Sequence, residues 1–197
     1  MPNDELTAQI LAIFFAATEP VTLEQLCQVF PDLDAARLTD HVSQVMQDFH
    51  SLQNAVEIRS VAGGYRMTTR PEHHEIVRCY LKTRPSAKLS LAALETLSVI
   101  AYKQPITLPE IMEIRGIKGT STIRTLLEKK LIQTKGRKKV VGRPILYGTT
   151  REFLVHFGLN DLSELPTLTE LEEILGQDVV RSSATQGTQG TEGTERT

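Results

Sequence analysis

Tryptophan is absent from this chain of 197 residues, and phenylalanine and tyrosine together bring the aromatic content to only 5%. Cysteine is nearly as scarce. Cys27 and Cys79 are too few for a disulfide framework, and we expect both to be buried, inert thiols. No apolar run approaches the roughly 20 residues of a membrane-spanning helix. The N-terminus shows no basic segment ahead of an apolar one, so we predict no signal peptide and a cytosolic protein.

Motifs that carry chemistry are also missing. The sequence contains no glycine-rich phosphate loop, no CxxC pair and no HExxH. His73 and His74 are neighbours, so on a helix they would point about 100° apart and could not both face one metal ion. We therefore expect a protein that is not an enzyme, with no catalytic residue, no cofactor and no metal.

What the chain does contain is an internal repeat. Residues 19–26 read EPVTLEQL and residues 104–111 read QPITLPEI. In each copy a threonine is followed three residues later by a side chain that can reach back to its N–H, Gln25 after Thr22 and Glu110 after Thr107. This is a capping box, so we predict that Thr22 and Thr107 are N-caps of a short second helix.

The repeat continues on both sides of this motif. Apolar residues recur at helical spacing before it and again after it. In the first copy they are Leu6, Ile10, Ile13, Phe14 and Ala17, then Leu38, Val42, Val45, Met46 and Phe49; in the second they are Leu91, Leu94, Leu97 and Ala101, then Ile123, Leu126, Leu127 and Leu131. Each copy therefore predicts three helices, the third capped by Asp34 in copy one and by Thr120 or Ser121 in copy two.

A β-hairpin follows the third helix in each copy. Val56 and Ile58 alternate before a Gly-Gly turn, and Tyr65 and Met67 alternate after it. The second hairpin has a longer loop between residues 132–134 and 145–147. Both hairpins run into Thr-Thr-Arg, and further helices are predicted at 71–81 and 152–157, the latter capped by glycine.

Three helices and a hairpin make a winged helix. The predicted fold is mainly α with small β-hairpins (α+β): tandem winged-helix domains at residues 1–84 and 85–166, joined through KTRPSAKL at 82–89. Residues 167–197 form a tail. Its first part has Leu168, Leu171, Ile174 and Leu175 at helical spacing, and the Thr-Gly-rich remainder, with little to bury, is predicted to be disordered.

Charge is distributed unevenly along the chain. Residues 1–84 carry a net charge of −4, residues 85–166 carry +6 and the tail carries −4. The positive excess gathers on the second wing, at Lys135, Arg137, Lys138, Lys139 and Arg143. These residues suit contact with phosphate or with an acidic partner, and a solvated basic loop is the alternative.

The third helices differ in the same way. A DNA-binding winged helix places this helix in the major groove. Arg124, Lys129 and Lys130 would suit that role in copy two, whereas copy one has Asp40 and Asp48 with only Arg37. A symmetric tandem DNA reader is therefore not expected. A transcription regulator that reads DNA with its second domain is the alternative to a protein-binding adaptor.

Two long stretches resemble one family, segregation and condensation protein B (ScpB). They are LSLAALETLSVIAYKQPITLPEIMEIRG at Leu89–Gly116 and GRPILYGTTREFLVHFGLNDLSELP at Gly142–Pro166. The resemblance covers the second predicted domain almost wholly and the first through its layout of elements. The loop IKGTST at Ile117–Thr122 departs from the family pattern.

The resemblance implies a specific function. Members of this family are non-enzymatic subunits of the bacterial condensin complex, cytoplasmic and associated with the nucleoid. They form homodimers chiefly through the N-terminal winged helix and bind the kleisin ScpA, which bridges the ATPase heads of SMC. The complex acts in chromosome condensation and segregation during cell division. Direct contact with DNA would be weak and non-specific, and no membrane contact is expected.

Overall fold

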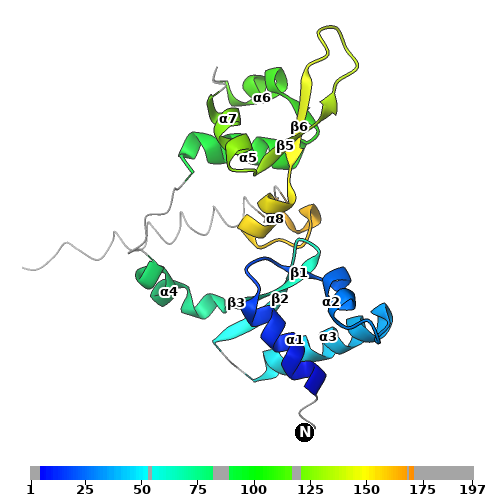
Figure 1. The fold of residues 1–197 in the computed structure, drawn as a ribbon. Helices are drawn as coiled ribbons and strands as arrows, with labels where there is room; N and C mark the ends of the chain where they lie inside the picture. The colour runs from blue at the N-terminus through cyan, green and yellow to red at the C-terminus, as the bar shows by residue number, and fades with distance from the viewer. Residues whose placement is uncertain (1–4, 53–54, 82–88, 117–120, 168, 171–197) are drawn as a thin grey trace, which may run out of the picture. The chain divides into compact units, whose positions relative to one another are not determined.

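A computed structural model describes residues 5–52, 55–81, 89–116, 121–167 and 169–170 of the chain (Figure 1). The same order of elements occurs twice. The first copy comprises α1 (Glu5–Ala16), β1 (Val21–Thr22), α2 (Leu23–Val29), α3 (Ala35–Ser51), β2 (Val56–Val61), β3 (Gly64–Thr69), the 3-10 helix η1 (Pro71–His73) and α4 (His74–Leu81). The second comprises α5 (Leu91–Lys103), β4 (Ile106–Thr107), α6 (Leu108–Arg115), α7 (Ser121–Glu128), β5 (Ile132–Arg137), β6 (Ile145–Thr149), α8 (Arg151–Phe157) and η2 (Leu162–Glu164).

Each copy is a winged helix, which confirms the predicted α+β class. Its three-stranded antiparallel sheet has the order β1-β3-β2 in the first copy and β4-β6-β5 in the second. The sequence predicted both hairpins but missed β1 and β4. These strands are only two residues long, so they show no alternation, and they exist because the segment ahead of the second helix pairs with the hairpin.

The turn of the first wing lies one residue earlier than Gly-Gly suggests. Val61 pairs with Gly64, so the two-residue loop is Ala62-Gly63. Both loop residues have positive φ, 51° and 73°, as a type I′ turn requires. Gly64 is a strand residue, and a Cβ there would lie 2.9 Å from the carbonyl oxygen of Val21. Close approach of β1 therefore requires glycine at position 64.

The core of the first copy follows the predicted helical faces. Its buried members are Ile10, Phe14, Val21, Leu26, Leu38, Val42, Val45 and Ile58. The helix caps also agree, because the carboxylate of Asp34 accepts a hydrogen bond from the backbone N–H of Arg37 at 2.7 Å. The helical residues that the 3.6-residue apolar period predicts to be buried thus form most of the core of the first winged helix.

The second core corrects one prediction. Leu97 and Ala101 are buried as expected, but Leu91 is 73% exposed and Leu94 39% exposed. The buried face of α5 consists of Ala93, Thr96, Leu97, Ile100 and Ala101. Leucine spacing alone pointed to the wrong side of the helix, since the true face includes small and polar residues.

Thr96 can be buried there because its polar group is satisfied. Its hydroxyl donates to the carbonyl of Ala92 at 2.8 Å and accepts a hydrogen bond of 2.6 Å from the guanidinium of Arg115. Arg115 also pairs with Glu95 at 2.8 Å. The α6 helix is therefore tied to α5 by polar contacts beside the apolar core.

Residues Met1–Leu162 form one compact unit, and Ser163–Thr197 form a second. None of the described helices is both long and apolar enough to cross a bilayer. The predicted linker, most of the predicted tail helix and the Thr-Gly-rich segment lie outside the described residues, as does Thr120. Among the described residues, α7 begins at Ser121.

Candidate interaction surfaces

The two capping boxes lie where the sequence placed them, although they differ in detail. In the first, the hydroxyl of Thr22 accepts from the N–H of Gln25 at 3.3 Å, and the Gln25 side chain accepts from the N–H of Thr22 at 2.9 Å. In the second, Glu110 accepts from both the N–H and the hydroxyl of Thr107, at 2.9 and 2.6 Å. Thr107 is buried, whereas the carboxylate of Glu110 is partly exposed.

The basic residues of the second wing do not all lie in its loop. Lys135 and Arg137 belong to strand β5, which corrects the expectation that they sit on an extended loop. The stem of Lys135 lies over β6, because a Cβ on Gly148 would come within 3.0 Å of its Cγ. Arg137 donates to the carbonyl of Arg143 at 3.0 Å. The strand thus holds these cations against its own hairpin.

Lys138 is paired with a carboxylate. Its ammonium forms an ion pair with Glu110 of α6. This contact, followed by the hydrogen bonds from Thr107, lowers the pKa of Glu110 to about 2. Lys139 and Arg143 remain at the tip of the wing, both exposed. They flank Val140 and the fully exposed Val141, so the tip presents apolar as well as positive surface.

The third helices offer little positive charge to DNA. On α3, Arg37 pairs with Asp34 across one turn. On α7, Arg124 pairs with Glu128 at 2.8 Å. Lys129 and Lys130 were expected on this helix, but α7 ends at Glu128 and Lys130 has a positive φ of 56°. Neither helix therefore has the basic face of a recognition helix.

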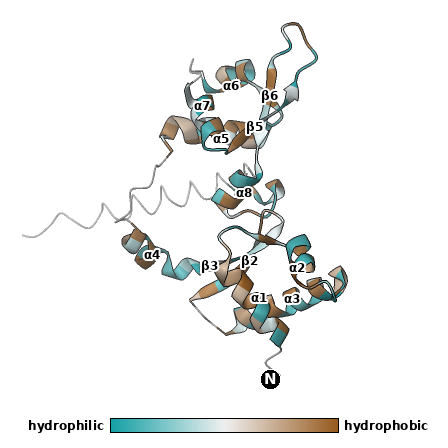
Figure 2. Cartoon of the chain, in the orientation of Figure 1, coloured by the Kyte–Doolittle hydropathy of each residue, from teal (hydrophilic) through white to brown (hydrophobic). Residues whose placement is uncertain are grey.

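The most distinctive surface of the first copy is an amphipathic helix that its own domain does not bury. The α4 helix buries none of its residues, and Ile76 and Tyr80 are 69% and 71% exposed. Figure 2 shows apolar residues along it. Because α4 is amphipathic, an apolar side of this kind is typical of a helix that packs against a partner.

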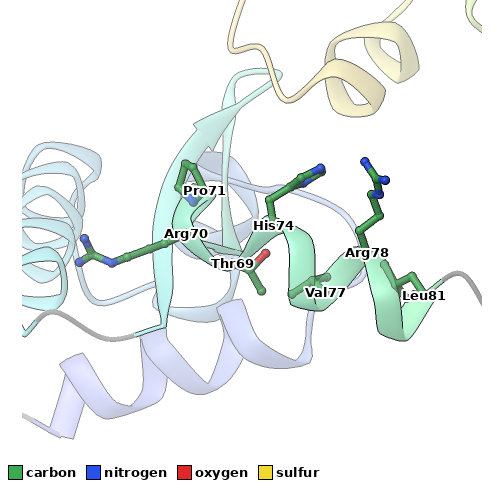
Figure 3. Close-up of a pocket in the computed structure, with 7 residues that line it drawn as sticks. All are labelled: Thr69, Arg70, Pro71, His74, Val77, Arg78 and Leu81. Carbon is green, nitrogen blue, oxygen red and sulfur yellow. The ribbon is translucent and has the colours of Figure 1, made fainter. Parts of the chain in front are cut away.

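A pocket lies between α4 and the end of β3. It is lined by Thr69, Arg70, Pro71, His74, Val77, Arg78 and Leu81 (Figure 3). His74 and Arg78, one turn apart, project on the same side, and the Arg70 side chain extends away from α4. The guanidinium of Arg70 donates to the carbonyl of His50 at 2.7 Å, which ties the end of β3 to α3.

The cysteine prediction needs a correction. Cys27 is only half-buried, and Cys79 is exposed on α4. Both thiols were expected to be buried, but Cys79 lies on α4, a helix that buries none of its residues. Within the described parts of the chain, no three His, Cys, Asp or Glu side chains gather as a metal site. His73 ends η1 and His74 begins α4.

Comparison with known proteins gives one consistent family. The family described as "Segregation and condensation complex subunit ScpB" matches residues 8–168. The curated segregation and condensation protein B of Syntrophotalea carbinolica is 44% identical over 174 residues, which are 88% of this chain and 87% of the relative.

Solved structures under the same name also align. ScpB from Mycobacterium tuberculosis is 29% identical with a TM-score of 0.39, over 81% of this chain and 98% of that one. A dimer of an ScpB N-terminal domain complexed with an ScpA peptide is 18% identical with a TM-score of 0.36, over 39% of this chain and 94% of that one.

Proposed function

This chain belongs to the family of the segregation and condensation complex subunit ScpB, and on that premise we propose that it is a non-enzymatic subunit of a condensin-like complex. In this proposal it acts with SMC and the kleisin ScpA in chromosome condensation and segregation during cell division. It works in the cytoplasm, associated with the nucleoid, and needs no cofactor.

The observation that carries this proposal is the exposed apolar side of α4. A subunit that binds other proteins needs apolar surface that its own fold leaves uncovered. Ile76, which is 69% exposed, supplies such surface in the first copy. We infer that the first domain, residues 1–84, forms a homodimer through α4, since a second copy of the same helix offers a matching apolar side.

The second domain, residues 85–166, supplies the kleisin-binding surface in this proposal. The support is the exposed apolar residues that its core leaves outside. Leu91 and Leu94 lie one turn apart on α5, and Ile114 on α6 is also exposed. The apolar side of an amphipathic kleisin helix could pack against these exposed residues and bury them.

The test of the function is the composition of the complex. The full chain is produced with its candidate kleisin, and the mass of the product is measured by light scattering and native mass spectrometry. We expect a stable complex that contains two copies of this chain. Failure to bind the kleisin at micromolar concentration would contradict the assignment.

The dimer is tested by substitution on α4. Ile76→Glu would place a charge on the exposed apolar side, so we expect it to shift the chain to monomer while leaving its circular dichroism unchanged. Val29→Glu is the matched control, because Val29 is an exposed apolar residue on α2. A dimeric Ile76→Glu protein would exclude α4 as the interface.

The domain boundary is tested by proteolysis. Protease should cut near Arg84–Lys88 and in the tail after about Ser182. A fragment ending near Leu81 should self-associate, and one starting near Lys88 should be monomeric. The reverse result would move the dimer interface to the second domain.

A further inference from the structure

The turn of the first wing is held by the second copy. The backbone N–H of Ala62 donates to the carbonyl of Leu159 at 2.9 Å, and the N–H of Gly63 donates to the side-chain oxygen of Asn160 at 3.0 Å. In a two-residue hairpin loop these N–H groups lie outside the ladder. Here they find acceptors almost 100 residues further along the chain.

The opposite side of the turn is held by an arginine. Arg151, the first residue of α8, donates from Nε to the carbonyl of Ala62 and from Nη2 to the carbonyl of Pro20, both at 3.3 Å. One guanidinium therefore joins the wing turn to the residue that precedes β1. The two donors sit on different nitrogens of one planar guanidinium, a fixed arrangement that the single ammonium nitrogen of a lysine does not provide.

The α8 helix fixes the spacing of these groups. Thr150 caps its N-terminus by accepting from the N–H of Phe153 at 3.1 Å, which sets the position of Arg151. At the other end Gly158 adopts a left-handed φ of 69°, and the N–H of Leu159 returns to Leu154 at 2.9 Å. Both ends of a short, capped helix thus present hydrogen-bonding groups to the same turn.

The repeated Thr-Thr-Arg tripeptide shows that this use is particular to the second copy. Arg70, the arginine of the first tripeptide, donates to the carbonyl of His50 within its own copy. Arg151 reaches instead to residues 89 and 131 positions away. The arginine of the tripeptide therefore forms a contact within the first copy, whereas its counterpart in the second copy connects the two copies.

We propose that α8 and the Leu159–Asn160 segment form a docking site for the first wing turn, and that Arg151 and Asn160 are its positioning residues. The site binds the turn through its backbone, so it requires the positive φ values of Ala62 and Gly63 rather than particular side chains. It makes residues Met1–Leu162 a single unit, in agreement with their compactness. It also covers the turn that a DNA-binding winged helix would leave free for the duplex.

Amide hydrogen exchange of the full chain, read by NMR, tests the site directly. We expect the N–H groups of Ala62 and Gly63 to exchange slowly, as do groups with internal acceptors. Asn160→Ala removes the acceptor of Gly63 and keeps the backbone carbonyl of Leu159 that accepts from Ala62, so exchange at Gly63 should rise on the order of fivefold while Val61, in the strand, is unchanged. Asn160→Asp keeps an acceptor oxygen and should restore slow exchange.

Arg151→Ala should accelerate both turn amides, because it releases the turn from its other side. Arg70→Ala is the matched control, since it removes the corresponding arginine of the first copy and should leave Ala62 and Gly63 slow. Fast exchange of both amides in the unaltered protein would overturn the proposal. So would slow exchange that survives both Asn160→Ala and Arg151→Ala. Neither result depends on kleisin binding, so the proposed function is tested separately.

Discussion

Lys138, the residue that follows strand β5 in the second wing, forms an ion pair with Glu110 of α6. The other oxygen of this carboxylate accepts the two hydrogen bonds from Thr107, which also pairs in strand β4. One side chain therefore connects the wing, the second helix and the sheet. The contacts of Lys138 and then Thr107 with the ionised form lower the pKa of Glu110 from 4.5 to about 2.

This pKa predicts how acid affects the second copy. A carboxyl whose folded pKa lies below its unfolded pKa stabilises the fold above the unfolded value, and the contribution is lost as pH falls through the folded value. As pH falls from about 4.5 to 2, the unfolding free energy of the wild-type protein should therefore decrease by the contribution of this carboxylate. Glu110→Gln lacks the carboxylate, so its unfolding free energy should not show this part of the decrease. Because the group is partly exposed, added salt should reduce the difference.

Urea unfolding at neutral pH and at about pH 2.5 measures this effect. The control is Glu113→Gln, an exposed position on the same helix that forms no ion pair with another of the described residues. We expect a smaller drop in unfolding free energy for Glu110→Gln than for the wild type and the control. Equal drops in all three proteins would show that the ion pair does not stabilise the fold.

The capping threonine of the second copy can be tested separately. Thr107→Ala removes a buried hydroxyl and one of the two hydrogen bonds that Glu110 accepts from Thr107, so it should lower the unfolding free energy by about 1 kcal/mol. Thr107→Ser retains the hydroxyl and should recover most of the loss. Kleisin binding at low temperature should persist in both. A Thr107→Ala protein with wild-type stability that fails to bind would show that the threonine is a contact residue.

The two glycines of the central strands should differ in their tolerance of alanine. At Gly64 the new Cβ would meet the backbone of Val21 at 2.9 Å, and backbone in a paired strand cannot move aside. At Gly148 it would meet Oε1 of Gln104 at 2.8 Å, which is the end of a side chain. Gln104 is nevertheless held, because Oε1 accepts from the N–H of Thr149 at 2.8 Å.

Both substitutions should therefore destabilise the protein, by about 1–3 kcal/mol for overpacking, with Gly64→Ala the more severe. Thermal and urea unfolding measure the order. Gly63→Ala is a different case, since its Cβ would meet no atom within 4 Å and the cost comes only from φ of 73°. If Gly148→Ala proved worse than Gly64→Ala, the distinction between backbone and side-chain collisions would be wrong here.

Local signals in the sequence were sufficient for the repeated elements. Capping boxes, apolar periods and Gly-Gly act within a few residues, so Thr22, Thr107, Asp34 and both hairpins could be located. The third strand of each sheet could not, because a two-residue strand depends on its partner. The buried face of α5 was misassigned for a related reason: the hydroxyl of Thr96 is satisfied in the core by the carbonyl of Ala92 and by Arg115, which lies on another helix.

The surfaces were harder to predict than the fold. Adding up lysines and arginines identified the second wing as positive, but it could not show that Lys138 is paired with Glu110. Nor could the tripeptide Thr-Thr-Arg reveal that Arg151 donates to carbonyls of the first copy of the repeat. Long-range polar contacts depend on how the domains meet, and no periodicity in the sequence encodes that.

The second wing provides the last prediction, which separates an adaptor from a DNA-reading regulator. Lys138→Glu would place two carboxylates together and destabilise the domain, so it is a poor test. Lys139 and Arg143 lie exposed at the tip, and Lys139→Glu with Arg143→Glu removes positive charge there without disturbing the ion pair. Lys103→Glu, at an exposed position on α5, is the control for charge alone.

An adaptor should bind duplex DNA weakly and without sequence preference. If both tip residues contact phosphates, each contact releases counterions. The negative slope of log affinity against log salt should then become shallower by about 2 in the double variant. The control should keep the wild-type slope, and kleisin binding should be intact in both variants. DNA binding is measured by fluorescence anisotropy at several salt concentrations, with duplexes of different sequence. Sequence-selective binding at physiological salt that the double variant loses would favour the regulator, because neither phosphate contact nor the paired arginines of α3 and α7 could supply it.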